Sequence, residues 1–178
     1  MATSVAVFGS SEISREEPAW REAQDVGRLL ARAGFRVVNG GYGGVMEAAS
    51  QGATEAGGPA LGITCAAFGR GPGNPYLTEE RSEPDLFGRT RALIEICDAY
   101  IILAGKAGTL AELALLWALH RGGLLGRKPV VLLGGFWSGF VDDLIRRGLL
   151  DDSQAAVTAL ALTPEDAVGI VRRQVTPR

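Results

Sequence analysis

The sequence predicts an α/β fold: a Rossmann-like, doubly wound parallel sheet in a single domain over residues 1–178. Short apolar segments alternate with longer amphipathic ones along the chain, which is the order of strands and helices in such sheets. The apolar segments are continuous, as in strands covered on both faces. The length of 178 residues is typical of one domain. Right-handed crossovers then fix most of the topology.

The first half of the chain supplies three predicted strands. Residues 4–9 (SVAVFG) form a short apolar segment and are expected to be a buried strand. Apolar residues at helical spacing predict a helix over residues 16–33, and Gly34 ends it as a C-terminal cap. We expect further elements at residues 35–39 (strand), 45–56 (a helix of small residues) and 60–65 (strand).

The second half begins with a segment that has no period. Residues 66–83 are rich in glycine, proline and charge, which predicts a long loop, and such loops in compact domains are often functional. A helix with proline in its first turn is expected next. The predicted elements are 84–97 (helix), 99–103 (strand), 110–120 (helix), 129–133 (strand), 137–147 (helix), 156–162 (strand) and 164–173 (helix).

Composition and charge exclude several classes of protein. Hydrophobic residues make up 47% and charged residues 21% of the chain, which is typical of globular proteins and not of disordered ones. No apolar run reaches the roughly 18 residues of a membrane-spanning helix, and the N-terminus lacks the basic segment of a signal peptide. A net charge of −2 gives no overall basic field. We therefore expect a cytoplasmic protein that binds neither membrane nor nucleic acid.

The residues that usually bind metals are few. Cys65 and Cys97 stand singly in apolar segments, which indicates small buried residues and not a disulfide or a metal pair. His120 is the only histidine, and its place near a helix C-terminus favours an interaction with the helix dipole over catalysis. We expect neither a metal nor a cofactor.

Glycine is the unusual feature, at 25 residues, and much of it is clustered. Three glycine-bearing turns follow predicted strands, at residues 9–11, 40–44 and 105–109. In parallel sheets of this kind, ligands bind outside the carboxyl ends of the strands. The three turns are therefore expected to converge on one ligand site.

Residues 104–112 (AGKAGTLAE) are the strongest candidate for an anion site. A strand, a glycine turn and a helix present free N–H groups to an anion, and Lys106 can add charge. The alternative is local: Thr109 caps the helix, and Glu112, three residues later, completes a capping box. The segment is neither a Walker loop nor GxGxxG.

Other candidates also have two interpretations. The segment GGYGG (residues 40–44) is either a tight turn before a helix or a backbone against which a nucleotide or sugar lies. Arg89, taken alone, is more typical of a solvated surface charge. The apolar stripe of Leu113, Leu116 and Trp117 fits a core, a subunit interface or a pocket wall.

Two of these segments together resemble motifs of the LOG family, also called lysine-decarboxylase-like. Residues 40–47 (GGYGGVME) resemble its GGGxxGLMG motif, and residues 104–112 resemble PGGxGTxxE. An ungapped alignment places the family's catalytic arginine on Arg89 and its catalytic glutamate on Glu112. The chain departs from the pattern at Ala104, Lys106, Thr90 and Glu47. These departures resemble a short bacterial branch that is related to molybdenum-cofactor carrier proteins, which share the fold but only bind.

The resemblance implies hydrolysis of the N-glycosidic bond of a nucleoside 5′-monophosphate, either a cytokinin riboside monophosphate or an AMP-like nucleotide. The products would be the free base and ribose 5-phosphate. Glu112, expected in the first helical turn and ionised, would stabilise the oxocarbenium-like sugar, and Arg89 would hold the base or sugar. The alternative is a non-catalytic nucleotide- or molybdenum-cofactor-binding protein of the same fold. A pyridoxal-phosphate decarboxylase would need Lys106 or Lys128 as a Schiff-base lysine.

The resemblance also implies a homodimer or higher homo-oligomer and a small phosphorylated ligand. The residues expected to bind its phosphate or nucleotide are Gly9, Ser10, Ser11, Gly40, Gly41, Gly43, Gly44, Met46, Gly105, Lys106, Ala107, Gly108 and Thr109.

Overall fold

The computed structural model describes residues 2–176, and its centre is one seven-stranded sheet. The strands are β1 (Ser4–Phe8), β2 (Arg36–Asn39), β3 (Ala60–Cys65), β4 (Glu79–Glu83), β5 (Ala99–Ile102), β6 (Val130–Leu133) and β7 (Thr158–Ala161). Their order across the sheet is β4-β3-β2-β1-β5-β6-β7, and every neighbouring pair is parallel. The predicted Rossmann-like fold is confirmed.

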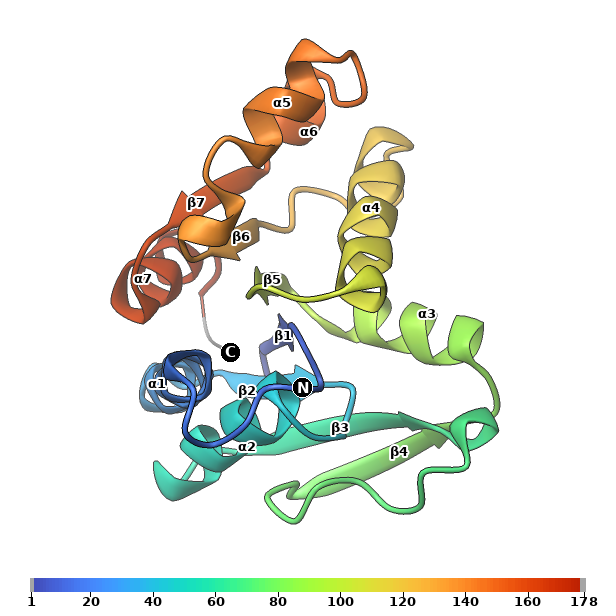
Figure 1. The fold of residues 1–178 in the computed structure, drawn as a ribbon, viewed down its shortest axis with the longest axis vertical. Helices are drawn as coiled ribbons and strands as arrows, with labels where there is room; N and C mark the ends of the chain where they lie inside the picture. The colour runs from blue at the N-terminus through green and yellow to red at the C-terminus, as the bar shows by residue number, and fades with distance from the viewer. Residues whose placement is uncertain (1, 177–178) are drawn as a thin grey trace.

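Helices cover both faces of the sheet (Figure 1). They are α1 (Pro18–Arg32), α2 (Val45–Glu55), α3 (Leu86–Ile96), α4 (Ala107–Arg121), α5 (Phe140–Arg146), α6 (Asp152–Ala155) and α7 (Pro164–Gln174). Val5 and Val7 of β1 belong to the core shared with α1, α2 and α7, whereas Ala6 and Phe8 belong to the core under α3 and α4. The two faces of one strand thus supply two cores, which explains its continuous apolar sequence.

The helices α1 and α2 pack closely because small residues line their contact. A Cβ atom on Gly52 would lie 1.9 Å from the carbonyl oxygen of Gln24, and one on Gly27 would lie 2.0 Å from that of Ala49. This contact fixes α2 against the sheet and therefore fixes its N-terminus beside the ends of β1 and β2.

The strand order reverses between β1 and β5, and this topological switch point creates a crevice at their carboxyl ends. The chain after β1 is tied to both sides of the crevice. The Ser10 amide donates to the Ala104 carbonyl (3.1 Å), and the Val45 amide donates to the Ser10 carbonyl (2.9 Å).

The expectation of a structureless loop over residues 66–83 is wrong, because its last residues form β4 beside β3. This strand has the sequence EERSE and is mostly exposed at the sheet edge. Charged residues are common on edge strands because they discourage further pairing, and they leave no apolar period to detect.

Other differences concern element ends. Pro84 precedes α3 and does not lie in its first turn, since Asp85 is the N-cap residue. Residues 135–137 form a 3₁₀ turn with Trp137 fully buried, so α5 begins only at Phe140. Cys65 and Cys97 are free and buried, as expected. No helix within residues 2–176 is long and apolar enough to cross a membrane.

Candidate active site

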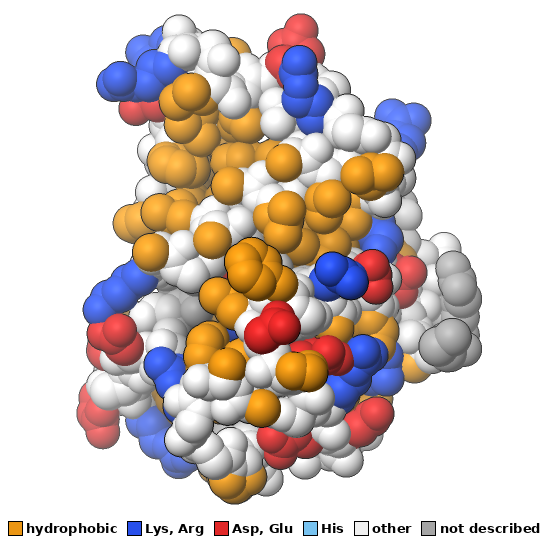
Figure 2. All heavy atoms as spheres, turned by 90° about the vertical axis from the view of Figure 1, so that its right-hand side faces the viewer, with side chains coloured by type: hydrophobic (Ala, Val, Ile, Leu, Met, Phe, Trp, Pro, Cys, Tyr) orange, Lys and Arg blue, Asp and Glu red, His pale blue; other side chains and the backbone are white. Residues whose placement is uncertain are grey.

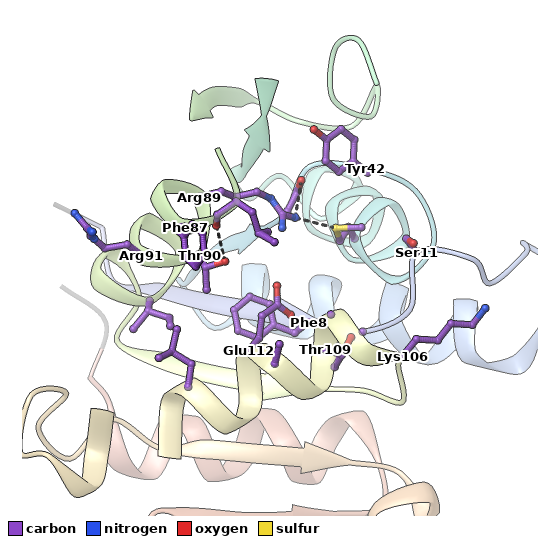
Figure 3. A pocket seen from close by; sticks show the side chains of 18 of the residues that line it. Phe8, Ser11, Tyr42, Phe87, Arg89, Thr90, Arg91, Lys106, Thr109 and Glu112 are labelled. Atoms are coloured by element: carbon purple, nitrogen blue, oxygen red, sulfur yellow. Dashed lines mark hydrogen bonds between the residues drawn. The ribbon is translucent and has the colours of Figure 1, made fainter. Parts of the chain in front are cut away.

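The three glycine turns border one pocket of about 1020 Å³ at the carboxyl ends of β1, β2 and β5 (Figure 3). Residues of helices α3 and α4 form the other walls of the pocket. The predicted site residues that line this pocket are Gly9, Ser10, Ser11, Gly40, Met46, Arg89, Lys106, Gly108, Thr109 and Glu112. The structure therefore brings together residues from four separate segments of the chain.

The other predicted glycines shape the backbone around the pocket without lining it. Gly44 has a positive φ of 64°, and a Cβ there would lie 2.3 Å from the Ser10 carbonyl oxygen. A Cβ on Gly105 would lie 2.2 Å from the Thr109 hydroxyl. Gly41 also has a positive φ, Gly43 borders an adjoining pocket of about 460 Å³, and Ala107 is exposed at the start of α4.

Helix α4 begins earlier than the sequence suggests, and its N-terminus faces the pocket. Lys106 is the N-cap residue and makes no side-chain cap, so the alternative in which Thr109 caps the helix is wrong. The amides of Ala107, Gly108 and Thr109 have no hydrogen-bond acceptor within residues 2–176. Such free amides at a helix N-terminus favour an anion.

Thr109 gives an independent indication of a ligand. The residue as a whole is only 4% exposed, and no hydrogen bond joins its hydroxyl to another described residue. The hydroxyl oxygen is not among the fully buried atoms, so it is open to a ligand in the pocket that Thr109 lines.

Arg89 lies on α3 and is buried, not solvated as a lone arginine would suggest. Its Nε donates to the Ile63 carbonyl (2.8 Å), and its Nη2 donates to the Gly40 carbonyl (3.2 Å). The rings of Tyr42 and Phe68 lie 5.8 Å from its guanidinium carbon. The remaining nitrogen, Nη1, has no hydrogen-bond partner within residues 2–176, so it can serve a ligand.

Glu112 projects from α4 toward the space that Arg89 enters from α3 (Figure 3). Desolvation raises the pKa of its carboxyl to about 7, and the charge of Arg89 opposes this shift only in part. The expectation that Glu112 lies in the first helical turn is wrong, and a pKa near 7 leaves its carboxyl only about half ionised at neutral pH. Because α4 begins at Ala107, Glu112 lies one turn further along, away from the free amides.

Sequence reasoning missed part of the wall. Arg70, from the segment expected to be a loop, stacks 5.3 Å from the ring centroids of both Tyr42 and Phe68. All three residues line the pocket. An aromatic residue inside the glycine-rich segment GGYGG was the only available signal.

The pocket continues as an apolar groove between α3 and α4, on a face where apolar side chains gather (Figure 2). Leu86, Phe87, Leu115 and Leu124 are exposed there. By contrast, the stripe of Leu113, Leu116 and Trp117 belongs to the core, which settles the three interpretations of that stripe.

The remaining candidates lie at the edge of the site or outside it. Lys106 forms an exposed ion pair with Glu12. Lys128 donates to the carbonyls of Ile94 and Glu95, and His120 contacts the Gly126 carbonyl near the end of α4. Within residues 2–176 no group of three or more His, Cys, Asp or Glu side chains could hold a metal ion.

The geometry defines the class: a Rossmann-like α/β protein with a small-ligand pocket at the topological switch point of its sheet. Within this class, the chain belongs to the SLOG cluster4 family, whose family model matches residues 2–166.

Relatives agree with this assignment. An uncharacterized protein of Archaeoglobus fulgidus is 33% identical over 74% of this chain and 83% of its own length. A cytokinin riboside 5′-monophosphate phosphoribohydrolase of Rhodococcoides fascians is 34% identical over 73% of this chain and 67% of its own. A rice (Oryza sativa subsp. japonica) protein named as a probable phosphoribohydrolase of the same kind is 29% identical over 92% of this chain and 70% of its own.

Solved structures share the fold. A structural-genomics X-ray structure is 33% identical with a TM-score of 0.78, covering 96% of this chain and 99% of the other. The molybdenum cofactor binding protein of Rippkaea orientalis is 26% identical with a TM-score of 0.77, covering 99% of both chains. The sequence relatives thus include proteins named for hydrolysis, and a structure of the same fold is named for binding.

Proposed function

We propose that the protein hydrolyses the N-glycosidic bond of a nucleoside 5′-monophosphate, either a cytokinin riboside monophosphate or an AMP-like nucleotide. The products are a free base and ribose 5-phosphate. One observation carries the proposal: Glu112 and Arg89 enter one pocket from opposite walls, beside a helix N-terminus with free amides. Relatives named as phosphoribohydrolases support it.

In this proposal the 5′-phosphate binds the amides of Ala107, Gly108 and Thr109 and the Thr109 hydroxyl. These contacts anchor the substrate away from the reacting bond, so that binding energy can position the sugar. The turns after β1 and β2 lie around the ribose. The anomeric carbon then faces Glu112.

The C1′–N bond breaks with its electron pair leaving on the base, and the sugar passes through an oxocarbenium-like state. The Glu112 carboxylate stabilises that positive charge and accepts a proton from the attacking water, whose oxygen bonds to C1′. Arg89 donates a hydrogen bond from Nη1 to the departing base and stabilises its negative charge. Over the whole reaction, water supplies a hydroxyl to C1′ and a proton to the base.

The pKa of Glu112 makes both activity and stability depend on pH. Because the ionised form is the active one, base release should rise with pH and reach half its maximum near pH 7. The unfolded chain ionises this group near 4.5, so between pH 4.5 and 7 it binds fewer protons than the folded protein. The free energy of unfolding therefore falls as pH rises through that window.

Thermal melts of the unliganded protein across pH 4.5–8 test this prediction without interference from the substrate phosphate, which itself titrates near pH 6. The Glu112→Gln variant should lack this component of the fall. Base release that decreases as pH rises through 7 would contradict the role given to the carboxylate.

The function is tested with purified protein and a panel of nucleoside 5′-monophosphates, with free base and ribose 5-phosphate separated by chromatography. The matching unphosphorylated nucleosides are the controls. We expect base release from one or more nucleotides and much less from their nucleosides. Equal rates for both would contradict the phosphate site, and no release from any nucleotide would contradict the hydrolase.

A second candidate is a non-catalytic carrier of a nucleotide or of the molybdenum cofactor. The similarity to the Rippkaea orientalis protein favours it, and the pocket volume of about 1020 Å³ lies at the upper end of the range for small-molecule sites. A pterin that co-purifies with the protein, together with no base release, would support the carrier.

The proposal includes a homodimer or higher homo-oligomer, as the LOG resemblance implies. The apolar side chains exposed on α3 and α4, among them Phe87 at 84% exposure, are of the kind that subunit contacts cover. Light scattering of the purified protein would test this, and a monomer at micromolar concentration would contradict it.

A further inference from the structure

Two positions where the chain departs from the LOG pattern contact the same loop. Both Glu47, in the first motif, and Lys106, in the second, stand where that pattern has glycine. Lys106 pairs with Glu12, and Glu47 accepts a hydrogen bond from Arg15 at 2.8 Å. Glu12 and Arg15 both belong to the loop between β1 and α1, so both departures form ion pairs with this loop.

Hydrogen bonds tie the start of this loop to the ends of the neighbouring strands, so Glu12 lies beside the pocket. The Glu12 amide donates to the Ser10 hydroxyl at 3.1 Å, and Ser10 is bonded in turn to Ala104 and Val45. The side chains of Glu12 and Lys106 are nevertheless 63% and 70% exposed. Exposed ion pairs contribute little to stability, so side-chain rotation alone can separate them.

Glu12 and Lys106 line the same pocket as the free amides of α4 and the unpartnered Thr109 hydroxyl. The Glu12 carboxylate already pairs with the ammonium group of Lys106, the N-cap residue beside those amides. A phosphate carries a larger charge and three acceptor oxygens, so it can bind the amides, the hydroxyl and an ammonium group together. Within residues 2–176 the carboxylate of Glu12 is bonded only to the ammonium group.

We propose that Glu12 is an internal competitor for the phosphate of the ligand. In the unliganded protein Glu12 pairs with Lys106, and when a phosphorylated ligand binds, Lys106 exchanges Glu12 for the phosphate. The pair thereby sets the affinity and selectivity for phosphorylated ligands. This inference rests on the phosphate position given in the proposed function.

The exchange is tested by calorimetric titration with ribose 5-phosphate, and with adenosine as the unphosphorylated probe. Glu12→Gln should tighten ribose 5-phosphate binding about two- to fivefold, as expected from removal of one exposed competing charge. Lys106→Gln should weaken it by a similar factor. Adenosine binding should not change in either variant. The matched control is Asp152→Asn, which removes the same charge on α6, outside the pocket.

A double-mutant cycle separates competition from simple repulsion. If Glu12 competes for Lys106, the gain from Glu12→Gln should largely disappear in the Lys106→Gln background. A gain that persists there, or an equal gain in Asp152→Asn, would overturn the exchange. If nucleotides are hydrolysed while Glu12→Gln leaves affinity unchanged, the exchange is wrong and the proposed function stands. If ribose 5-phosphate binds to none of the proteins, the phosphate position is wrong as well.

Discussion

Glu112→Gln should reduce kcat for base release by about a thousandfold or more, because it removes the charge that stabilises the sugar cation and the base that accepts the proton of water. The substitution keeps the size and shape of the side chain. It also leaves untouched the α4 amides and Thr109, which bind the phosphate in the proposal. Affinity for ribose 5-phosphate should therefore change by less than about threefold, as calorimetry can measure.

The Glu112→Gln variant should lose activity but gain thermal stability at alkaline pH. Above pH 7 the wild-type protein holds an ionised carboxylate in a poorly solvated position, which is why its pKa is raised. Glutamine removes that charge, so the variant should melt at a higher temperature than the wild type at pH 8. The control is Glu165→Gln, at an exposed residue on α7. This substitution should neither lower turnover nor raise the melting temperature at pH 8. An inactive variant that is also less stable at pH 8 would indicate a damaged fold instead of a lost catalytic group.

The parts of the fold that sequence predicts well are those whose signal is local. The buried strands are continuous apolar segments, and the glycine turns follow them directly, so their convergence at one sheet edge follows from the parallel topology. The strand β4 was missed because an edge strand has a single partner and needs no apolar face.

The chemistry of the site depends on contacts between distant segments, which local patterns do not encode. Arg89 resembles a surface charge in its own helix, and only the motif resemblance singled it out. Its burial depends on carbonyl acceptors at Ile63 and Gly40, on two other strand ends. The pKa of Glu112 likewise depends on where α4 begins, and the unpaired state of Thr109 follows from Lys106 taking the N-cap position.

Arg89 is the second residue whose replacement should have a large effect. Arg89→Met should lower kcat/KM about a hundred- to a thousandfold, because the departing base loses the hydrogen bond that stabilises its charge. The carbonyls of Ile63 and Gly40 also lose their donors, which should lower the free energy of unfolding by about 1–3 kcal/mol. Steady-state kinetics with the preferred nucleotide and denaturant unfolding measure the two effects.

Arg89→Lys distinguishes the charge from the geometry. Lysine keeps a positive charge near Glu112, but a single ammonium group cannot hold two carbonyls and still reach the base as a guanidinium does. Its activity should therefore fall almost as far as in Arg89→Met.

The pH dependence of stability should separate the two variants. The Arg89 charge lowers the pKa of Glu112 in the folded protein, so its loss in Arg89→Met should extend the pH-dependent fall in stability to higher pH. In Arg89→Lys that fall should stay near its wild-type position. Activity within about threefold of wild type in Arg89→Met would contradict the catalytic role. No pH shift in Arg89→Met would mean that burial alone, and not the neighbouring charge, sets the ionisation of Glu112.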